Sequence, residues 1–254
     1  MVDNKVKQIS IVTVCFNAIE YISKTMESVL AQVVKNIEYI IIDGGSNDGT
    51  VDLIDSYVNK FEAKGIRVKF ISERDNGVYD AMNKASDIAS GEWIIYMNAG
   101  DVFFDEYVLM DFLNNKFDAT VAAVYGDTVC VDNNSEVMYK AEAIDKIIYK
   151  KPFCHQSVFT KTKLQQEYRF DLNFKIQADY DLFLRLYKDK REITHFNRVI
   201  SKFNLEGMSS DPQNSRLIYR EMIEVHKKNH CDIMKHPKML LYYIKRILDV
   251  YLLP

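Results

Sequence analysis

The chain is poor in the features that would place it in a special class of protein. Its 254 residues include four cysteines, four prolines and nine glycines. The cysteines show no CxxC spacing, so we expect neither a disulfide framework nor a zinc knuckle, and a reducing cytosol is the simpler setting. The segment MVDNKVKQIS at the start holds no apolar signal segment, and no apolar run is long enough to span a bilayer. We therefore expect a cytoplasmic protein.

The overall composition and charge exclude further classes. A net charge of −3 argues against nucleic-acid binding driven by phosphate neutralisation. With 48% hydrophobic and 27% charged residues, the chain is typical of a globular protein with a sizeable core, large enough for one large domain or for one domain with an appendage. No GxGxxG follows any apolar run, which disfavours a dehydrogenase.

Apolar runs alternate with helical patterns over the first hundred residues. This alternation is typical of βαβ units and a mostly parallel sheet. Right-handed crossovers then place the carboxyl ends of the strands along one edge of that sheet. The expected strands are 9–16, 37–42, 68–72 and 92–97, and the expected helices run from about 18 to 31, from 50, and from 78 to just before Gly91.

The pattern changes in the second half of the chain. A fifth strand is expected at 119–125, continued or bent at 128–131. After Pro152 one clear helix is expected near 178–187, surrounded by short apolar stretches, and the last forty residues indicate two helices separated near Pro237. We expect a domain at 1–210 and a C-terminal helical extension at 211–254. The short apolar stretches are 157–159, 193–196 and 199–203.

The most informative segment is YIIIDGGSNDGT, residues 39–50. A continuous apolar run indicates a strand buried on both faces, and it ends in Asp43, Gly44 and Gly45. The glycines let the chain turn sharply and approach a ligand closely. Open α/β sheets bind nucleotides at the carboxyl ends of their strands, so Asp43 is a candidate acceptor for a base or ribose. The alternative is a carboxylate that only satisfies the N–H groups of its own turn.

A second acidic segment follows the third expected strand. Glu73 and Asp75 lie on the same sheet edge, and Asp80 and Asn83 fall in the first turns of the next helix. Acids near a helix start are electrostatically favoured, which is sufficient for Asp80. The helix-start explanation accounts less well for Glu73, Asp75 and Asn83, which lie at an edge that already carries other acids. We therefore keep these three as candidate nucleotide-site residues.

Asp101 follows the fourth expected strand, in the segment IIYMNAGD. A carboxylate at this place can reach a divalent cation, and magnesium and manganese fill their other positions with water and diphosphate oxygens. Such a cation would neutralise the charge on a departing nucleoside diphosphate. The alternative for Asp101 is the N-cap of a helix at 102–113.

Asp179 stands at the start of an amphipathic helix in QADYDLFLRLY, residues 177–187. Tyr180, Phe183, Leu184 and Tyr187 follow the i, i+3, i+4, i+7 spacing and form its buried face. Asp179 could act as a general base that takes a proton from an attacking hydroxyl. The alternative is a first-turn carboxylate favoured by the helix dipole.

These segments, taken in order, resemble glycosyltransferase family 2 with its GT-A nucleotide-sugar fold, and in particular small bacterial members of polysaccharide and lipopolysaccharide clusters. The resemblance extends from about residue 9 to 209. It implies a three-layer α/β fold with a mostly parallel central sheet and a C-terminal helical tail. The segments that carry it are SIVTVCFN, IIDGGSNDGT, ERDNGVYDAMNKA, GEWIIYMNAGD, HQSVF and ADYDLFLRL.

The resemblance assigns a nucleotide site to the first half of the chain. Asp43 would hold the base of the donor nucleotide, with the backbone around Phe16 and Asn17 lining the same pocket. Asp75 and Asn83 would help to shape that site. A UDP-sugar is the favoured donor.

The resemblance also assigns metal and acceptor groups. Asp101 matches the last acid of the metal-binding motif, for Mg²⁺ or Mn²⁺. Asp179 matches the acid of the Glu-Asp pair that acts as catalytic base. His155-Gln156 and residues 207–209 match segments near the acceptor and the diphosphate.

The chain departs from the family pattern at two places. The metal motif has Asn98 and Gly100 where the family has other residues, so a metal would rest on Asp101, with His155 as a candidate second ligand. Ala178 precedes Asp179 where the family usually has an acid. A non-catalytic nucleotide-sugar-binding module is therefore one alternative function. A sugar-phosphate nucleotidyltransferase is another, disfavoured because no basic glycine-rich loop follows the first strand.

The resemblance implies an inverting glycosyltransferase, and we expect it to act on a glycan or lipid-linked acceptor. The apolar segment 239–253 could pack internally, form a homodimer or contact the membrane interface, which would place the protein at the inner face of the cell membrane. His226 and His230 have the spacing of a helical zinc site, but no HExxH glutamate is present, so a solvated basic face is the simpler interpretation.

Overall fold

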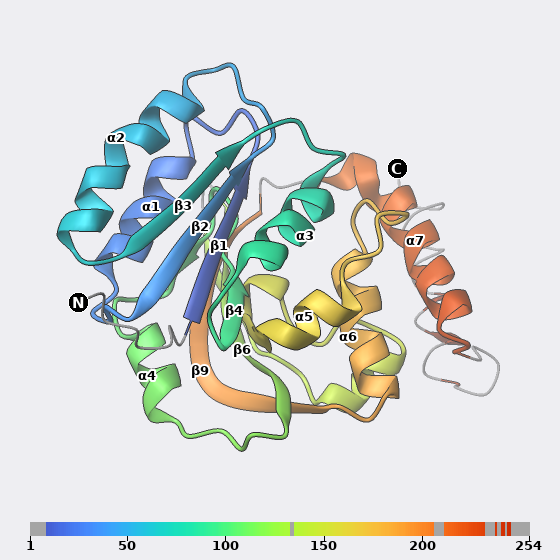
Figure 1. Ribbon diagram of the computed structural model, residues 1–254. Helices are drawn as coiled ribbons and strands as arrows, with labels where there is room; N and C mark the ends of the chain where they lie inside the picture. Colours follow the sequence, from blue (N-terminus) through green and yellow to red (C-terminus); the bar gives the residue numbers. More distant parts are fainter. Residues whose placement is uncertain are drawn as a thin grey trace.

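The computed structural model describes residues 9–132, 135–205, 211–231, 237, 240, 241, 243 and 244. Within these residues the fold is a curled mixed sheet with helices on both faces (Figure 1). The sheet order is β3-β2-β1-β4-β8-β6-β9-β5, with β7 paired to β6. The strands are β1 Ile9–Cys15, β2 Ile37–Asp43, β3 Arg67–Ser72, β4 Trp93–Tyr96, β5 Val102–Phe103, β6 Val121–Val131, β7 Glu136–Tyr139, β8 Val158–Lys161 and β9 Glu192–Asn204.

The helices divide between the two faces of the sheet. Side chains of α1, α2 and α4 share one core with alternate residues of β1 and β2, such as Ile11 and Ile41. Side chains of α3, α6 and α7 share the other core, with Val12 and Ile40. This period-2 division confirms the expected three layers. The helices are α1 Ile22–Ala31, α2 Thr50–Ala63, α3 Val78–Ile88, α4 Val108–Asn114, α5 Thr162–Tyr168, α6 Ala178–Lys188 and α7 Ser215–Lys228, with short 3-10 turns η1 Ile144–Ile148, η2 His155–Ser157 and η3 Pro212–Asn214.

The first half of the sheet is parallel, as the sequence predicts. β1 pairs with β2 and β4, and β2 pairs with β3. All seven residues of β1 and of β2 are buried, which explains why both strands are continuous apolar runs. The register sets Cys15 beside Asp43 and Asp43 beside Ser72, so these strand ends lie at one edge.

The second half is mixed and differs from the sequence expectation in its strand directions and in the extent of β9, whereas the continuation of β6 is one of the two expected courses. β4 and β6 are antiparallel to β8, whereas β6 and β9 run parallel over their length. The two stretches expected at 193–203 form the single strand β9, and β6 continues without a break to Val131. β6 accommodates this with register shifts around Gly126, where a Cβ atom would stand 2.5 Å from the carbonyl oxygen of Arg198.

The expected helix at 102–113 is wrong in its first half. Val102 and Phe103 form the short strand β5 against β9, and α4 begins only at Val108. Asp101 therefore does not cap a helix. The alternative structural role for this carboxylate is excluded, because the backbone after it is extended.

The described part of the C-terminal segment packs on α6. Lys228 Nζ and Asn229 Nδ2 each donate a hydrogen bond of 2.8 Å to the buried carboxylate of Asp181.

His226 is fully buried, with Nε2 2.7 Å from the hydroxyl of Tyr180, so the expected solvated face is wrong at this residue. Most of 239–253, like residues 207–209, lies outside the described residues. No helix found in the described ranges is long and apolar enough to cross a bilayer.

Candidate functional site

A cavity of about 1050 Å³ lies at the carboxyl ends of β1 and β4. Its far wall comes from η2 and from the start of α6 and part of α7, so both halves of the chain contribute to it. A volume of this order suits a ligand the size of a nucleotide sugar. Of the candidate site residues predicted from the sequence, those that line this cavity are Phe16, Asn17, Asp101, His155, Gln156 and Asp179.

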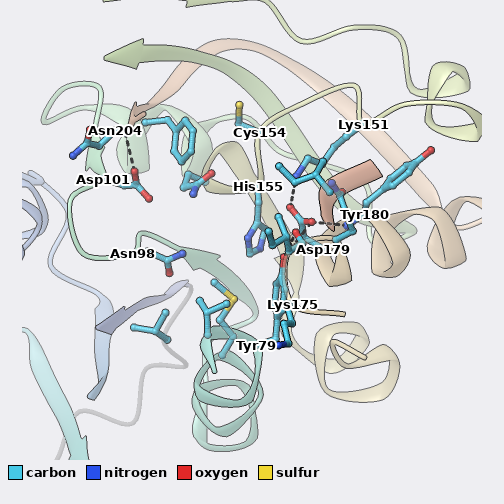
Figure 2. Close-up of a pocket in the computed structure, with 18 of the residues that line it drawn as sticks. Tyr79, Asn98, Asp101, Lys151, Cys154, His155, Lys175, Asp179, Tyr180 and Asn204 are labelled. Carbon is cyan, nitrogen blue, oxygen red and sulfur yellow. Dashed lines mark hydrogen bonds and ion pairs between the residues drawn. The ribbon is translucent and has the colours of Figure 1, made fainter. Parts of the chain in front are cut away.

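Asp101 lies on the β4 side of the cavity and is 4% exposed. Its Oδ1 accepts the backbone N–H of Asn204 at 3.1 Å, as Figure 2 shows. Burial raises the pKa of Asp101 to about 7, although hydrogen bonds from Asn204 and the Gln156 side chain act in the opposite direction. A cation beside this carboxylate would therefore be favoured, since it would relieve the cost of a buried negative charge.

Asn98 supplies a second oxygen near Asp101. It lines the same cavity, and its buried Oδ1 has no hydrogen-bond partner within the described residues. Buried polar atoms normally have partners, so an unpartnered oxygen on a cavity wall is consistent with a ligand position. The described ranges contain no group of three or more His, Cys, Asp or Glu side chains that could enclose a metal. One carboxylate and one amide oxygen still fit Mg²⁺ or Mn²⁺, which take most of their ligands from water and phosphate.

Asp179 lies across the cavity, in the first turn of α6, and is 4% exposed. Its Oδ2 accepts a hydrogen bond from Lys151 Nζ at 2.7 Å, and its Oδ1 accepts the N–H of Tyr180 at 2.7 Å (Figure 2). The hydroxyl of Tyr79 is 3.4 Å from the same Oδ1. Burial alone would raise the pKa of Asp179, but the charge of Lys151 and the hydrogen bonds from Lys151 and the N–H of Tyr180 hold it below the usual value. The carboxylate is therefore ionised near neutral pH.

His155 lies between Asp101 and Asp179 (Figure 2). Its ring is 6% exposed and contacts the rings of Tyr96 and Phe170, with centroids 5.1 and 5.5 Å away. Burial lowers the pKa of His155 to about 4, so the imidazole is neutral at physiological pH. It can offer a hydrogen bond or a lone pair to a ligand but not a positive charge.

Asp43 is fully buried and does not line the cavity. Its Oδ2 accepts hydrogen bonds from the N–H groups of Gly45 and Ser46 at 3.0 and 2.9 Å and from the hydroxyl of Ser72 at 2.7 Å, while the Ser46 hydroxyl donates to Oδ1. Burial favours the neutral form, yet these bonds outweigh it and lower the pKa. The carboxylate is thus engaged in holding its own turn.

Hydrogen bonds join that turn to the loop after β1. The N–H of Asn17 donates to Ser46 Oγ at 2.7 Å, and Asn17 Oδ1 accepts the N–H of Asn47 at 3.1 Å. Asn17 has a positive φ of 47°, a conformation that Asn tolerates better than most residues. The neighbouring Phe16 ring is 63% exposed and lines the cavity, where it could contact a base.

Three other predicted residues lie outside the lining of the cavity. Glu73 pairs with Lys84 at 2.8 Å on the surface. Asp75 accepts the N–H of Gly77 at 2.9 Å and approaches Gly44, where an added Cβ would stand 2.7 Å from its Oδ2. Asn83 is buried and exchanges two hydrogen bonds with the backbone of Phe170, at 2.9 and 3.0 Å.

Several residues of the site carry no sequence signal that would have revealed them. Lys151 contacts Asp179 from 28 positions earlier in the chain, and Tyr79 contacts it from 100 positions earlier. Asn204, which positions Asp101, comes 103 positions after it. No spacing rule connects such pairs, because only the folded sheet brings them together.

Comparisons with known proteins bear on the family and on the fold. The family model described as Glycosyl transferase family 2 matches residues 10–194. A PGL/p-HBAD biosynthesis glycosyltransferase of Mycobacterium tuberculosis is 27% identical over 202 residues, which cover 75% of this chain and 74% of the relative.

Two solved structures share the fold. S. aureus TarS 1–349 in complex with UDP-GlcNAc has a TM-score of 0.68 and 15% identity, covering 95% of this chain and 73% of that one. The mannosyltransferase PcManGT from Pyrobaculum calidifontis, in complex with GDP-Man and Mn²⁺, has a TM-score of 0.69 and 15% identity, covering 96% of this chain and 69% of that one. These likenesses confirm the expected GT-A fold.

Proposed function

Because this chain belongs to glycosyl transferase family 2, we propose that it transfers a sugar from a nucleoside-diphosphate sugar to a hydroxyl of a glycan or lipid-linked acceptor, with inversion at the anomeric carbon. The observation that carries the proposal is that Asp101 and Asp179 face one cavity from opposite walls. We assign the diphosphate to the wall that carries Asp101 and the acceptor hydroxyl to the wall that carries Asp179.

The donor nucleotide is assigned to the β1 side of the cavity. Phe16 and Asn17 offer an exposed ring and a polar backbone there. Asp43 acts on the base indirectly, by shaping the turn that follows it, since its own oxygens already accept hydrogen bonds from Gly45 and Ser46 of that turn and from Ser72 of β3. A UDP-sugar is favoured, in keeping with the UDP-GlcNAc complex of the TarS structure.

Asp101 and Asn98 are the residues that would hold Mg²⁺ or Mn²⁺. The chemistry supplied by that ion is neutralisation of the negative charge on the leaving diphosphate. The neutral His155 beside them is a candidate donor of a hydrogen bond to the same phosphate oxygens. The PcManGT neighbour, which contains Mn²⁺, supports this part of the proposal.

Asp179 is the proposed general base. It is ionised near neutral pH, so it can accept the proton of the acceptor hydroxyl as that oxygen attacks the anomeric carbon. The bond from the anomeric carbon to the diphosphate breaks in the same step, and the nucleoside diphosphate leaves. Lys151 keeps Asp179 ionised in spite of its burial. Ala178 gives this base no neighbouring acid, and Lys151 is the group that sets its charge instead.

Nucleotide binding gives the first test. We expect UDP with Mn²⁺ to raise the melting temperature by about 5–10 °C at a concentration near 100 times Kd, because a specific ligand stabilises only the folded state. GDP, dTDP and CMP serve as comparisons, and EDTA as the metal-free control. Equal shifts with all four nucleotides would contradict a specific donor site.

Turnover gives the second part of that test. The same protein is incubated with a panel of UDP-sugars and GDP-mannose, with Mn²⁺ and with p-nitrophenyl glycosides as acceptors. The quantity measured is the nucleoside diphosphate released, UDP or GDP. Release that depends on the acceptor is expected. Tight nucleotide binding without any release would favour a non-catalytic binding module.

The Lys151–Asp179 pair predicts a change in pH dependence. In Lys151→Met the buried carboxylate loses its nearest cation, so the pKa of Asp179 should rise. The acidic limb of the kcat profile should then move to higher pH, while the rate at alkaline pH recovers. Lys150→Met is the matched control, because Lys150 pairs with Glu142 and should leave the limb in place. An unmoved limb in Lys151→Met would contradict the pair.

A further inference from the structure

A buried carboxylate on α7 accepts hydrogen bonds from the segment that leads into α6. Glu221 is 2% exposed. Its Oε1 accepts the backbone N–H of Lys175 at 2.8 Å, and its Oε2 accepts the N–H groups of Ile176 and Gln177 at 2.9 and 3.0 Å. One side chain thus holds three consecutive amide groups that lie 44 to 46 positions earlier in the chain.

These amides stand where α6 begins. The N-cap residue Gln177 makes no side-chain capping bond, and a helix start leaves N–H groups without intrahelical partners. Glu221 supplies from another helix an acceptor for the N–H of the N-cap residue Gln177, as the acid at the third helical position does in a capping box, and for the N–H groups of the two residues before it. Its negative charge also lies at the end of α6 that favours anions. Asp179 is the second residue of this helix, so the place of its carboxylate follows the conformation of 175–177.

The opposite side of the same segment is also held. The hydroxyl of Tyr79 donates to the carbonyl oxygen of Ile176 at 2.6 Å and lies 3.4 Å from Asp179 Oδ1. Ile176 is therefore fixed at its N–H by α7 and at its carbonyl by α3. The position of α7 relative to α6 is fixed in turn, because Lys228 and Asn229 at the end of α7 donate hydrogen bonds to Asp181 of α6.

We propose that Glu221 is the positioning residue for Asp179. It sets the direction in which the Asp179 carboxylate faces the acceptor hydroxyl, and it does so without lining the cavity itself. The inference rests on the proposed function, in which Asp179 takes the acceptor proton. Glu221 lies beyond the range 10–194 that the family model covers, so the C-terminal part of this chain completes the acceptor side of its own site.

The Glu221→Gln variant tests this role. The replacement keeps the size of the side chain but turns one acceptor atom into an N–H donor that faces other donors. We expect kcat to fall roughly 10- to 100-fold, because a displacement of about 1 Å at a reacting group has an effect of this size. KM for the donor should change less than about twofold, since the variant leaves the donor contacts at the β1 side of the cavity unchanged.

Two further variants keep the test decisive. Glu224→Gln makes the same chemical change on the solvent side of α7, where the carboxylate is 52% exposed, and it should leave kcat unchanged. Glu221→Asp retains the charge but withdraws the carboxylate by one methylene, so it should show an intermediate loss even if Glu221→Gln does not fold. Rates are measured with the donor and p-nitrophenyl glycoside that release the most diphosphate in the turnover panel.

A double-variant cycle separates positioning from general stability. If Glu221 acts through Asp179, then Glu221→Gln should slow the enzyme much less in an Asp179→Asn background than in the wild type. A purely structural residue would lower the rate by the same factor in both. Wild-type kcat in folded Glu221→Gln or Glu221→Asp, or equal factors in the cycle, would overturn the positioning role. A fully active Asp179→Asn would instead overturn the proposed base, so the two failures are distinguishable.

Discussion

Asp179→Asn should lower kcat by roughly 100- to 10,000-fold, the range that a positioned general base contributes. The amide has nearly the shape of the carboxylate but cannot take the proton of the acceptor hydroxyl. Donor binding should persist, because the cavity wall formed by β1 and β4 does not depend on this side chain. Steady-state release of diphosphate and the UDP-induced thermal shift, measured on the same sample, separate these two effects.

The matched control for this variant is Asp189→Asn. Asp189 stands at the other end of α6, is exposed and bonds the hydroxyl of Tyr168 instead of facing the cavity. Its loss should leave kcat close to the wild-type value. If Asp179→Asn turned over at the wild-type rate with an unchanged pH profile, another group would have to accept the proton, and the proposed mechanism would be wrong.

Asp101→Asn should lower kcat about 1000-fold and remove the response to Mn²⁺. The variant can still accept the N–H of Asn204, so the local structure should be kept. What it loses is the carboxylate proposed to hold a cation on the diphosphate, and charge stabilisation by such an ion is worth several kcal/mol. The measurement is a Mn²⁺ titration of diphosphate release, together with the thermal shift caused by UDP with and without Mn²⁺.

Asp118→Asn is the surface control for this second variant, since Asp118 is exposed and lies away from the cavity lining. It should respond to Mn²⁺ as the wild type does. A wild-type enzyme whose rate is the same in EDTA and in Mn²⁺ would contradict the metal-assisted proposal, and it would leave His155 and other neutral donors as the groups that face the diphosphate.

Much of the fold could be predicted because its signals are local. The continuous apolar runs of β1 and β2 follow from strands buried on both faces. Tyr180, Phe183 and Leu184 of α6 are buried as their spacing predicts, although the structure also buries the other residues from Ala178 to Leu184. The second half was harder to predict. An apolar stretch such as 199–203 has the same composition whether it forms a separate strand or the end of a longer one, and only pairing with β6 makes it part of β9.

The site was predictable only in part, for the same reason. Asp101 and Asp179 each follow a local boundary that the sequence marks, and both line the cavity. Asp43 has an equally strong local signal, yet its carboxylate holds its own turn, because hydrogen bonds from Ser46 and Ser72 satisfy it first. Local pattern placed this acid at the correct sheet edge but could not show which way its oxygens face.

The amino-acid sequence by itself determined the class of fold, the sheet edge that carries the site and the order of the motifs, since these depend on apolar periodicity and on residues that are neighbours in the chain. The tertiary structure alone decided which charges meet. Lys151 reaches Asp179, and Glu221 reaches the start of α6, only because strands and helices distant in sequence pack side by side. Electrostatic and hydrogen-bond energies depend on distances through space, and no spacing along the chain encodes those distances.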